Sequence, residues 1–232
     1  MKLLQTLAVA WFVVAVTPGA ARADDSRVAV FAGGQFDFSN YVFGGVTVAL
    51  PGSTIGNGVA VRGLVDTGGY NYVSGDLGTV KANFGGGEID GVYQITHGNF
   101  WGDASLGVND TYTGLSPYDP NNRLRGQQVE LRVSLDGGSL SGPWRLDWFG
   151  YYGPRLLDYA AMVGGTHALS SIWRLGLQAY SEGNPTYTLY QVGPYAGLTF
   201  GHREELQFST GETWESGLTP RVYLKASLYQ RL

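Results

Sequence analysis

The sequence contains no cysteine, only three histidines and few charged residues, and each of these shortages removes a class of function. Without cysteine there is neither a disulfide framework nor a thiolate metal site. Charged residues make up 15% of the chain and form no basic run, so we expect no nucleic-acid partner. His97, His167 and His202 lie far apart without the spacing of metal ligands. The sequence therefore predicts no metal and no cofactor.

Catalytic groups are equally scarce. Histidine is the commonest general base, and none of the three stands in a catalytic pattern. Glu204 and Glu205 are adjacent, so in a strand they point to opposite faces and do not form a carboxylate pair. We expect them in a solvated turn, and we expect the protein not to be an enzyme.

Long apolar runs are also missing, except at the N-terminus. Lys2 is followed by the run LLQTLAVAWFVVAV, by the break Thr17-Pro18-Gly19, and by an A-x-A cleavage pattern at 21–23. This is the pattern of a secretory signal peptide, too short for a membrane span. We predict a signal peptide at 1–23 and one domain at 24–232; the alternative is an uncleaved anchor.

What the chain has in quantity is glycine, 36 residues, together with 13% aromatic residues. This mixture, with evenly spaced turn signals, is typical of an all-β protein rather than of a disordered chain. Alternating apolar and polar residues separate at turn clusters into about twelve segments. We expect strands near 28–38, 42–50, 59–72, 79–94, 98–112, 125–136, 143–152, 157–168, 172–181, 186–201, 205–214 and 219–232.

The stretch QVELRVSLDGG (128–138) shows what these strands present on their two faces. Val129, Leu131, Val133 and Leu135 share one face, and the charged residues take the other. The segments run about 10–14 residues, longer than the 5–6 typical of a sandwich and sufficient for the roughly 9–11 that span a bilayer. Charge stays off one face, as lipid contact requires, whereas tyrosines accompany the charges on the other. A β-sandwich is the alternative, but its outer face has no need of those tyrosines.

The last segment, PRVYLKASLYQRL, is an amphipathic strand of the kind that closes outer-membrane barrels. We therefore predict a closed antiparallel up-and-down transmembrane β-barrel of about 12 strands. The longer connections at 71–79 and 114–126 then lie outside the cell, whereas 51–58 is long for an inner turn. We also expect a bulge or a kink at Gly85–Gly87, where the apolar parity changes, and a bulge would accommodate Pro194 within its segment.

The face opposite the lipid would line the lumen. Aromatic rings with charged neighbours suit a neutral polysaccharide, because rings stack on sugar C–H faces and charges bond hydroxyl groups. The alternative is that tyrosines fill a narrow barrel while charges pair across it. The residues expected to point inward are Tyr151, Tyr180, Tyr195, Tyr223, Tyr229, Glu130, Arg132, Arg145, Asp147, Arg174 and Lys225.

Three stretches resemble a known family. FAGGQFDFSNYVFGGVTVALPGS (31–53), LSPYDPNNRLRG (115–126) and GPYAGLTFG (193–201) are similar to the BcsS-type cellulose biosynthesis proteins. The likeness covers essentially the whole chain after the signal peptide, and DPNNRLRG is its most specific part. The resemblance implies an outer-membrane protein of a Gram-negative bacterium associated with cellulose production. Its implied partners are outer-membrane lipid, cellulose or another β-glucan, and other components of cellulose synthesis.

The loop that carries DPNNRLRG has a physical interpretation of its own. Asp119 and Asn121 belong to a strong turn sequence, and Arg123 and Arg125 precede the next strand. The two arginines either fold into the lumen and pair with Glu130 or Asp136, or face lipopolysaccharide phosphates outside. We favour the pairing.

Three hypotheses of function follow. The first is an outer-membrane barrel that helps to export or anchor a β-glucan. The second is a structural or adhesion barrel, or a small porin, without specificity for cellulose. The third is a secreted soluble β-domain that binds carbohydrate.

Overall fold

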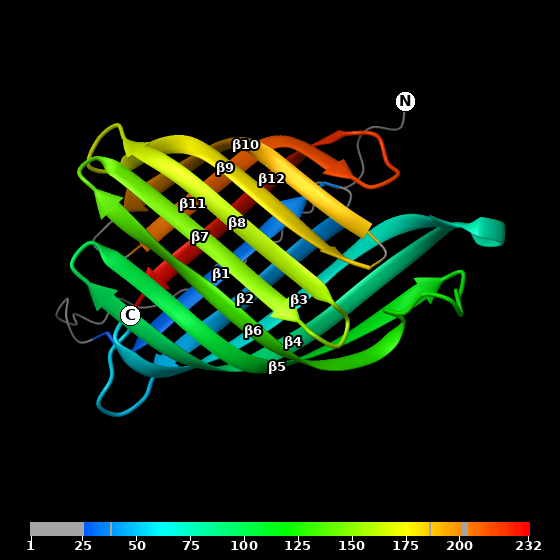
Figure 1. The fold of residues 1–232 in the computed structure, drawn as a ribbon, viewed down its shortest axis with the longest axis horizontal. Helices are drawn as coiled ribbons and strands as arrows, with labels where there is room; N and C mark the ends of the chain where they lie inside the picture. Colours follow the sequence, from blue (N-terminus) through cyan, green and yellow to red (C-terminus); the bar gives the residue numbers. More distant parts are fainter. Residues whose placement is uncertain (1–25, 38, 186, 201–203) are drawn as a thin grey trace.

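The computed structural model describes residues 26–37, 39–185, 187–200 and 204–232, and the signal peptide predicted at 1–23 lies outside them. The described chain is one antiparallel sheet of twelve strands that closes into a barrel (Figure 1). The fold is therefore the closed transmembrane β-barrel that the sequence predicts. The strands are β1 (Val28–Phe36), β2 (Ser39–Ala49), β3 (Gly58–Ser74), β4 (Gly78–His97), β5 (Phe100–Ser116), β6 (Gly126–Ser141), β7 (Trp144–Gly153), β8 (Asp158–Ala168), β9 (Trp173–Asn184), β10 (Tyr187–Phe200), β11 (Glu204–Glu215) and β12 (Arg221–Arg231).

Each strand pairs with its neighbours in sequence, and β1 pairs with β12 to close the sheet. The closing register runs from Ala29 opposite Arg231 to Phe36 opposite Leu224. Closure gives every strand two partners, so no sheet edge is left exposed in the bilayer, where an unpaired backbone group would cost several kcal/mol. All twelve predicted strands are present, with ends shifted by a few residues.

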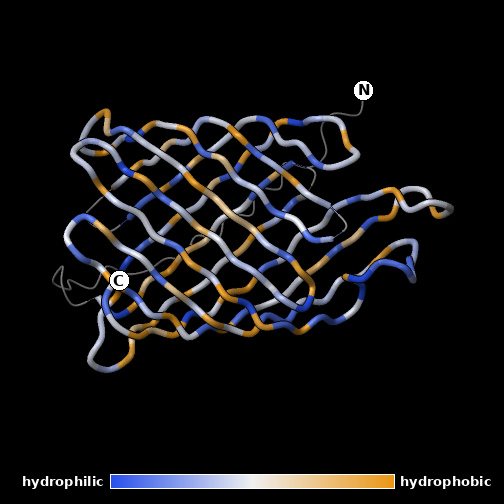
Figure 2. Tube along the Cα trace, in the orientation of Figure 1, coloured by the Kyte–Doolittle hydropathy of each residue, from blue (hydrophilic) through white to orange (hydrophobic). Residues whose placement is uncertain are grey.

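Side-chain alternation divides the barrel into an apolar outside and a polar inside. On β6, the four apolar side chains Val129, Leu131, Val133 and Leu135 are 44% to 62% exposed on the outer surface. Glu130 and Ser134 between them are buried inside. Large apolar side chains this exposed require lipid around them, which agrees with the transmembrane prediction. Figure 2 shows the same alternation of hydropathy along the strands.

The strands differ greatly in length around the barrel. β3, β4, β5 and β6 have 17, 20, 17 and 16 residues, whereas β1 has 9 and β12 has 11. About 9–11 residues suffice to cross a bilayer. The β3–β4 and β5–β6 hairpins therefore project beyond the rest of the barrel, as Figure 1 shows at one end of the molecule. We call this end the hairpin end.

The opposite end, which we call the terminal end, carries the C-terminus and the connection between β2 and β3. This connection is the long inner turn noted in the sequence. Gly52, Gly56 and Gly58 adopt positive φ angles of 85°, 93° and 95°, which glycine accepts without strain. Ile55 is buried, and its N–H donates to the Ser26 carbonyl at 2.8 Å. The turn therefore folds back against the barrel wall.

Neither of the two bulges considered from the sequence forms. At Gly85–Gly87 the pairing with β3 continues without an inserted residue, from Thr67 opposite Gly85 to Val65 opposite Gly87. The apolar parity changes because the inner face itself becomes apolar toward the hairpin end, not because the backbone slips. At Pro194 the register with β9 is continuous, and the β11 pairing resumes unshifted after it. Proline has no backbone N–H to donate, so the hydrogen bonding between β10 and β11 is interrupted there, but the pairing register stays the same.

No helix in the described residues has the length and apolar character that a membrane-spanning helix needs.

Candidate functional site in the barrel lumen

The lumen contains three clusters in which one arginine meets several acidic or hydroxyl groups. The first is centred on Arg62 of β3. Its Nε donates to Asp90 at 2.8 Å, its Nη1 lies 3.5 Å from Asp136, and its Nη2 donates to Ser105 at 2.8 Å and to Ser134 at 3.0 Å. These partners come from β4, β5 and β6. All three guanidinium nitrogens are thus engaged, and the cluster joins four neighbouring strands from inside.

The second cluster is centred on Arg132 of β6. Its guanidinium contacts Glu88 at 2.8 Å, Asp158 at 3.0 Å and Glu130 at 3.5 Å. Its carbon Cζ also lies 4.3 Å from the centre of the Tyr151 ring, within the range of a cation–π contact. Three carboxylates around one arginine leave a negative excess in this part of the lumen.

The third cluster reaches furthest around the barrel. Arg145 of β7 contacts Asp147 of the same strand and Glu205 of β11, both at 2.7 Å. Three strands separate β7 from β11 in the barrel, so this ion pair is a chord across the lumen. The expectation that Glu205 lies in a solvated turn is therefore wrong: it is the second residue of β11 and points inward, while Glu204, the first, contacts Gln230.

The predicted lumen tyrosines all point inward, but they offer little free surface. Tyr195 and Tyr223 are 4% and 0% exposed. Lys225 Nζ lies 4.5 Å from the centre of the Tyr180 ring, whose hydroxyl donates to Glu182 at 2.5 Å. Arg231 lies over Tyr229, as Arg132 does over Tyr151. Each of these rings is therefore enclosed or covered by a cation.

The predicted charged residues also have partners. Glu130, Arg132, Arg145 and Asp147 belong to the clusters above. Arg174 is less constrained: its guanidinium donates a 3.4 Å hydrogen bond to the Pro143 carbonyl.

Sequence reasoning missed a second feature of the lumen, a continuous row of six aromatic rings on β1–β4. Successive ring centres lie 6.5, 5.5, 6.2, 6.3 and 6.1 Å apart. The angles between neighbouring ring planes are 27° to 45°, so the rings are nearer parallel than perpendicular. We call this row the aromatic ladder; it consists of Phe31, Phe43, Tyr41, Phe84, Tyr70 and Tyr72 in that order.

Glycines opposite the phenylalanines explain how these rings are oriented. Three phenylalanines of the ladder each face a glycine directly across a strand pair, and a methyl group built on the glycine would overlap the ring. Each ring therefore lies over the backbone of the neighbouring strand instead of standing into the lumen. This pairing of glycine with phenylalanine is the sequence signal that could have revealed the ladder. The pairs are Phe31 with Gly45, Phe43 with Gly33 and Phe84 with Gly68.

The ladder ends at the DPNNRLRG loop. Asp119, which is 3% exposed, accepts hydrogen bonds from the Tyr72 hydroxyl at 3.0 Å and the Ser74 hydroxyl at 2.7 Å. Its other oxygen accepts from the N–H of Asn121 at 2.9 Å. The bond from Ser74, and next the backbone N–H of Asn121, lower the pKa of the Asp119 carboxyl. Asp119 thus attaches the loop to β3 beside the last ring.

The expected pairing of the loop arginines with Glu130 or Asp136 does not form. Arg125 donates to the Asn122 carbonyl at 2.9 Å and to the Tyr118 hydroxyl at 3.2 Å, both within the loop. Arg123 is exposed. The two acids are taken by Arg132 and Arg62 instead, because these arginines lie on the inner face itself.

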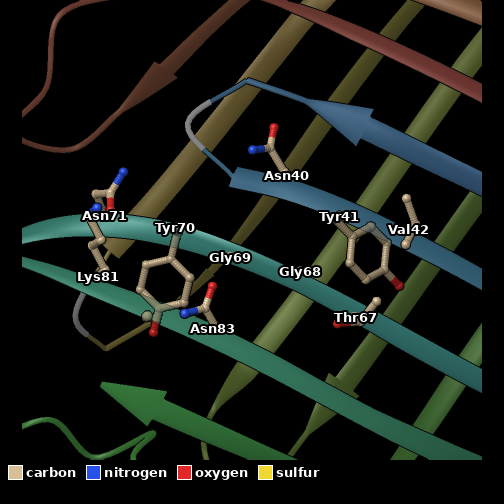
Figure 3. A pocket seen from close by; sticks show the side chains of 11 residues that line it. Asn40, Tyr41, Val42, Thr67, Gly68, Gly69, Tyr70, Asn71, Lys81 and Asn83 are labelled. Atoms are coloured by element: carbon tan, nitrogen blue, oxygen red, sulfur yellow. The ribbon is translucent and has the colours of Figure 1, made fainter. Parts of the chain in front are cut away.

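A hollow of about 460 Å³ lies where β2 begins beside β3 (Figure 3). β2 pairs with β3 only as far as Ser39 opposite Tyr70, whereas β3 continues to Ser74. Three asparagine amides and a lysine surround the hollow, and two tyrosines of the ladder contribute to it. Its lining is Asn40, Tyr41, Val42, Thr67, Gly68, Gly69, Tyr70, Asn71, Lys81, Ala82 and Asn83.

The histidines and acids show no metal-binding geometry within the described part of the chain. His97 is exposed at the end of β4, and the His167 ring packs edge-on against Trp144 at 4.7 Å. His202 lies outside the described residues.

Solved outer-membrane barrels resemble this fold. The KdgM porin has 8% sequence identity and a TM-score of 0.49, over 88% of this chain and 99% of that one. The COG4313 outer membrane channel from Pseudomonas putida F1 has 13% identity and a TM-score of 0.49, over 94% of this chain and 100% of that one. Likeness at this level concerns the fold alone. No curated protein sequence matches the chain.

Twelve closed strands, an apolar outer surface and a charged, aromatic lumen define the molecule as a β-barrel of the outer-membrane class. The family model for the cellulose biosynthesis protein BcsS matches residues 29–232. The chain belongs to this family, as the resemblance in its sequence indicated.

Proposed function

We propose that this barrel resides in the outer membrane of a Gram-negative bacterium and helps to anchor or export the cellulose chain there. It reaches that membrane through the signal peptide at 1–23, and it acts without catalysing a reaction. Its partners are the surrounding lipid, the glucan and other components of cellulose synthesis. The observation that carries the proposal is that a barrel of a cellulose biosynthesis family directs its polar and aromatic groups into a closed lumen.

Anchoring is the form of this function that the lumen supports better. The Arg145–Glu205 ion pair crosses the lumen, and the Arg132 cluster links β4, β6 and β8 inside it. Passage of a polymer would require these pairs to separate, and breaking a buried ion pair costs about 3–5 kcal/mol when one partner is lost. Holding the glucan at the hairpin end requires no such separation.

We also propose roles for the residues that the sequence predicted in the lumen and in the loop. The charged residues and their tyrosines brace the barrel and present carboxylates and guanidinium groups to hydroxyls. Asp119 and Asn121 shape the loop at the hairpin end, and Arg125 holds the loop together through Tyr118 and Asn122. The exposed Arg123 is available to groups outside the barrel.

Deletion of the gene in a cellulose-producing strain tests the function. We expect deletion to release cellulose from the cell surface into the medium, with total synthesis little changed, and we expect the wild-type gene to restore attachment. Loss of secreted and attached cellulose together, with glucan retained in the periplasm, would favour export. Unchanged amount and attachment would overturn both forms and leave a structural barrel.

Location is tested separately by isolating outer membranes and running the protein on a detergent gel with and without boiling. A closed barrel in that fraction shifts its mobility on heating. A soluble periplasmic band without a shift would contradict the proposed location.

A further inference from the structure

We propose that the aromatic ladder is a binding track for a neutral, extended glucan chain. The inference rests on the proposed function, and it names the binding residues and the chemical class that they select. Neither the tyrosines predicted from the sequence nor the arginine clusters form this track. It follows the inner face of β1–β4 from Phe31 toward Tyr72 at the hairpin end.

The orientation of the rings is the first argument. Three phenylalanines lie over glycines of the neighbouring strand, so their faces are turned toward the lumen. The C–H bonds on the face of a pyranose ring carry partial positive charge, and the face of an aromatic ring carries the negative part of its quadrupole. Rings laid against the wall therefore offer the surface on which a sugar stacks. An unbroken row of such rings suits a polymer rather than a single sugar.

The accessibility of the rings is the second argument. All six are partly exposed, in contrast to the nearly inaccessible Tyr195 and Tyr223. Among the described residues, the cation–π contacts involve Tyr151, Tyr180, Tyr229 and a tryptophan, and none involves a ring of the ladder. Within this part of the chain, no arginine or lysine occupies a face of the ladder.

A carboxylate beside the ladder is the third argument and selects the charge of the ligand. Asp66 lies directly opposite Phe43 in the pairing of β2 with β3. Its Oδ1 is buried and has no hydrogen-bond partner among the described residues. Such an oxygen is costly unless it accepts a hydrogen bond, and a sugar hydroxyl is a suitable donor. The same carboxylate repels a polyanion, so the track favours a neutral glucan over an acidic one.

The far end of the track is the fourth argument. Asp119 holds the Tyr72 hydroxyl at 3.0 Å, which positions the last ring. Asp119 also accepts a hydrogen bond from the Ser74 hydroxyl at 2.7 Å, so a carboxylate and two hydroxyl groups lie together beside the last ring. Such a set of groups donates and accepts hydrogen bonds, as recognition of sugar hydroxyls requires. The track therefore leads along the lumen to polar groups at the hairpin end.

The test is calorimetric titration of the purified full-length barrel in detergent with cellohexaose, maltohexaose and an oligogalacturonate of equal length. The variants are Tyr41→Leu and Phe84→Leu, which remove a ring face but keep an apolar side chain. Tyr41→Phe is the matched control because it keeps the ring. Tyr112→Leu, on the exposed outer surface, controls for the loss of a tyrosine elsewhere. Heat-shifted mobility on a gel verifies that each variant forms a barrel.

We expect cellohexaose to bind the wild type, the Tyr41→Phe variant and the Tyr112→Leu variant alike, and the oligogalacturonate not to bind. Each leucine variant should bind roughly two- to tenfold more weakly, because one aromatic stacking contact is lost. Equal binding by all variants would overturn the track while the proposed function stands. Binding of maltohexaose alone, with the same loss in the leucine variants, would support the track and overturn the role in cellulose. Binding of no neutral oligosaccharide, or equal binding of the oligogalacturonate, would overturn the track.

Discussion

The aromatic ladder and the three arginine clusters occupy the same lumen but stabilise it by different means. The clusters hold strands together through desolvated ions, each of which depends on its partners. The ladder uses apolar rings that rest on glycine backbones and leave their faces free. One part of the wall is thus committed to holding the barrel together, whereas the other retains unused binding surface.

The largest effect should come from breaking an arginine cluster. Replacing Arg132 with alanine leaves Glu88, Glu130 and Asp158 together without their cation. We expect a loss of about 3–5 kcal/mol in the free energy of unfolding, measured by denaturant unfolding in lipid vesicles. Arg174→Ala is the control, because it removes a single 3.4 Å hydrogen bond and should cost about 1 kcal/mol or less. Similar losses in both variants would show that the clusters do not brace the barrel.

A smaller effect should follow from disturbing one ring of the ladder. A methyl group at Gly45 overlaps the Phe31 ring and the Gly63 carbonyl, so Gly45→Ala should cost about 1–3 kcal/mol. A methyl group at Gly63 meets nothing within 4 Å, and Gly63→Ala should change stability by about 0.5 kcal/mol or less. The same unfolding measurement compares the two. Equal stability of both variants would contradict the close ring–glycine packing.

Replacing a ladder ring by leucine should have less effect still on stability. Phe84→Leu keeps an apolar side chain over Gly68, and apolar exchanges of similar volume usually cost under about 1.5 kcal/mol. We therefore expect the two properties to separate: Phe84→Leu loses glucan affinity with a small loss of stability, whereas Arg132→Ala loses about 3–5 kcal/mol of stability. A Phe84→Leu barrel as unstable as Arg132→Ala would erase the distinction between the two regions.

The smallest effect concerns the loop at the end of the ladder. The folded protein lowers the pKa of the Asp119 carboxyl, so the ionised carboxylate stabilises the folded loop. This stabilisation is fully present above the unfolded-state pKa, about 3.9, and it is lost as the pH falls through the lower folded-state pKa. A spin label at Asn121→Cys should therefore stay ordered at pH 7 and become mobile only below about pH 4. The absence of native cysteine makes the label unique. Adding Asp119→Asn should make it more mobile at pH 7; an unchanged spectrum would refute the anchoring role of Asp119.

Particular residues show how far prediction could go. Leu131 and Arg132 were assigned to the correct faces because successive side chains of any strand alternate. Glu205 was misplaced because its partner Arg145 is 60 residues away and meets it only across the closed lumen. The ladder was missed for a related reason, since the contact between Tyr41 and Phe84 depends on the registers of two strand pairs with Gly68 between them.

The order of residues along the chain thus determined the number of strands, the lipid-facing side of each strand and the barrel class. These properties follow from the alternation of apolar and polar side chains along each strand and from the turn-forming residues between strands. Only the tertiary structure decided which inward groups meet. Closure of β1 on β12 and the stagger of the strands bring Arg145 to Glu205, Arg62 to Asp136 and Tyr72 to Asp119. Such contacts depend on distances across a lumen, and local alternation carries no information about them.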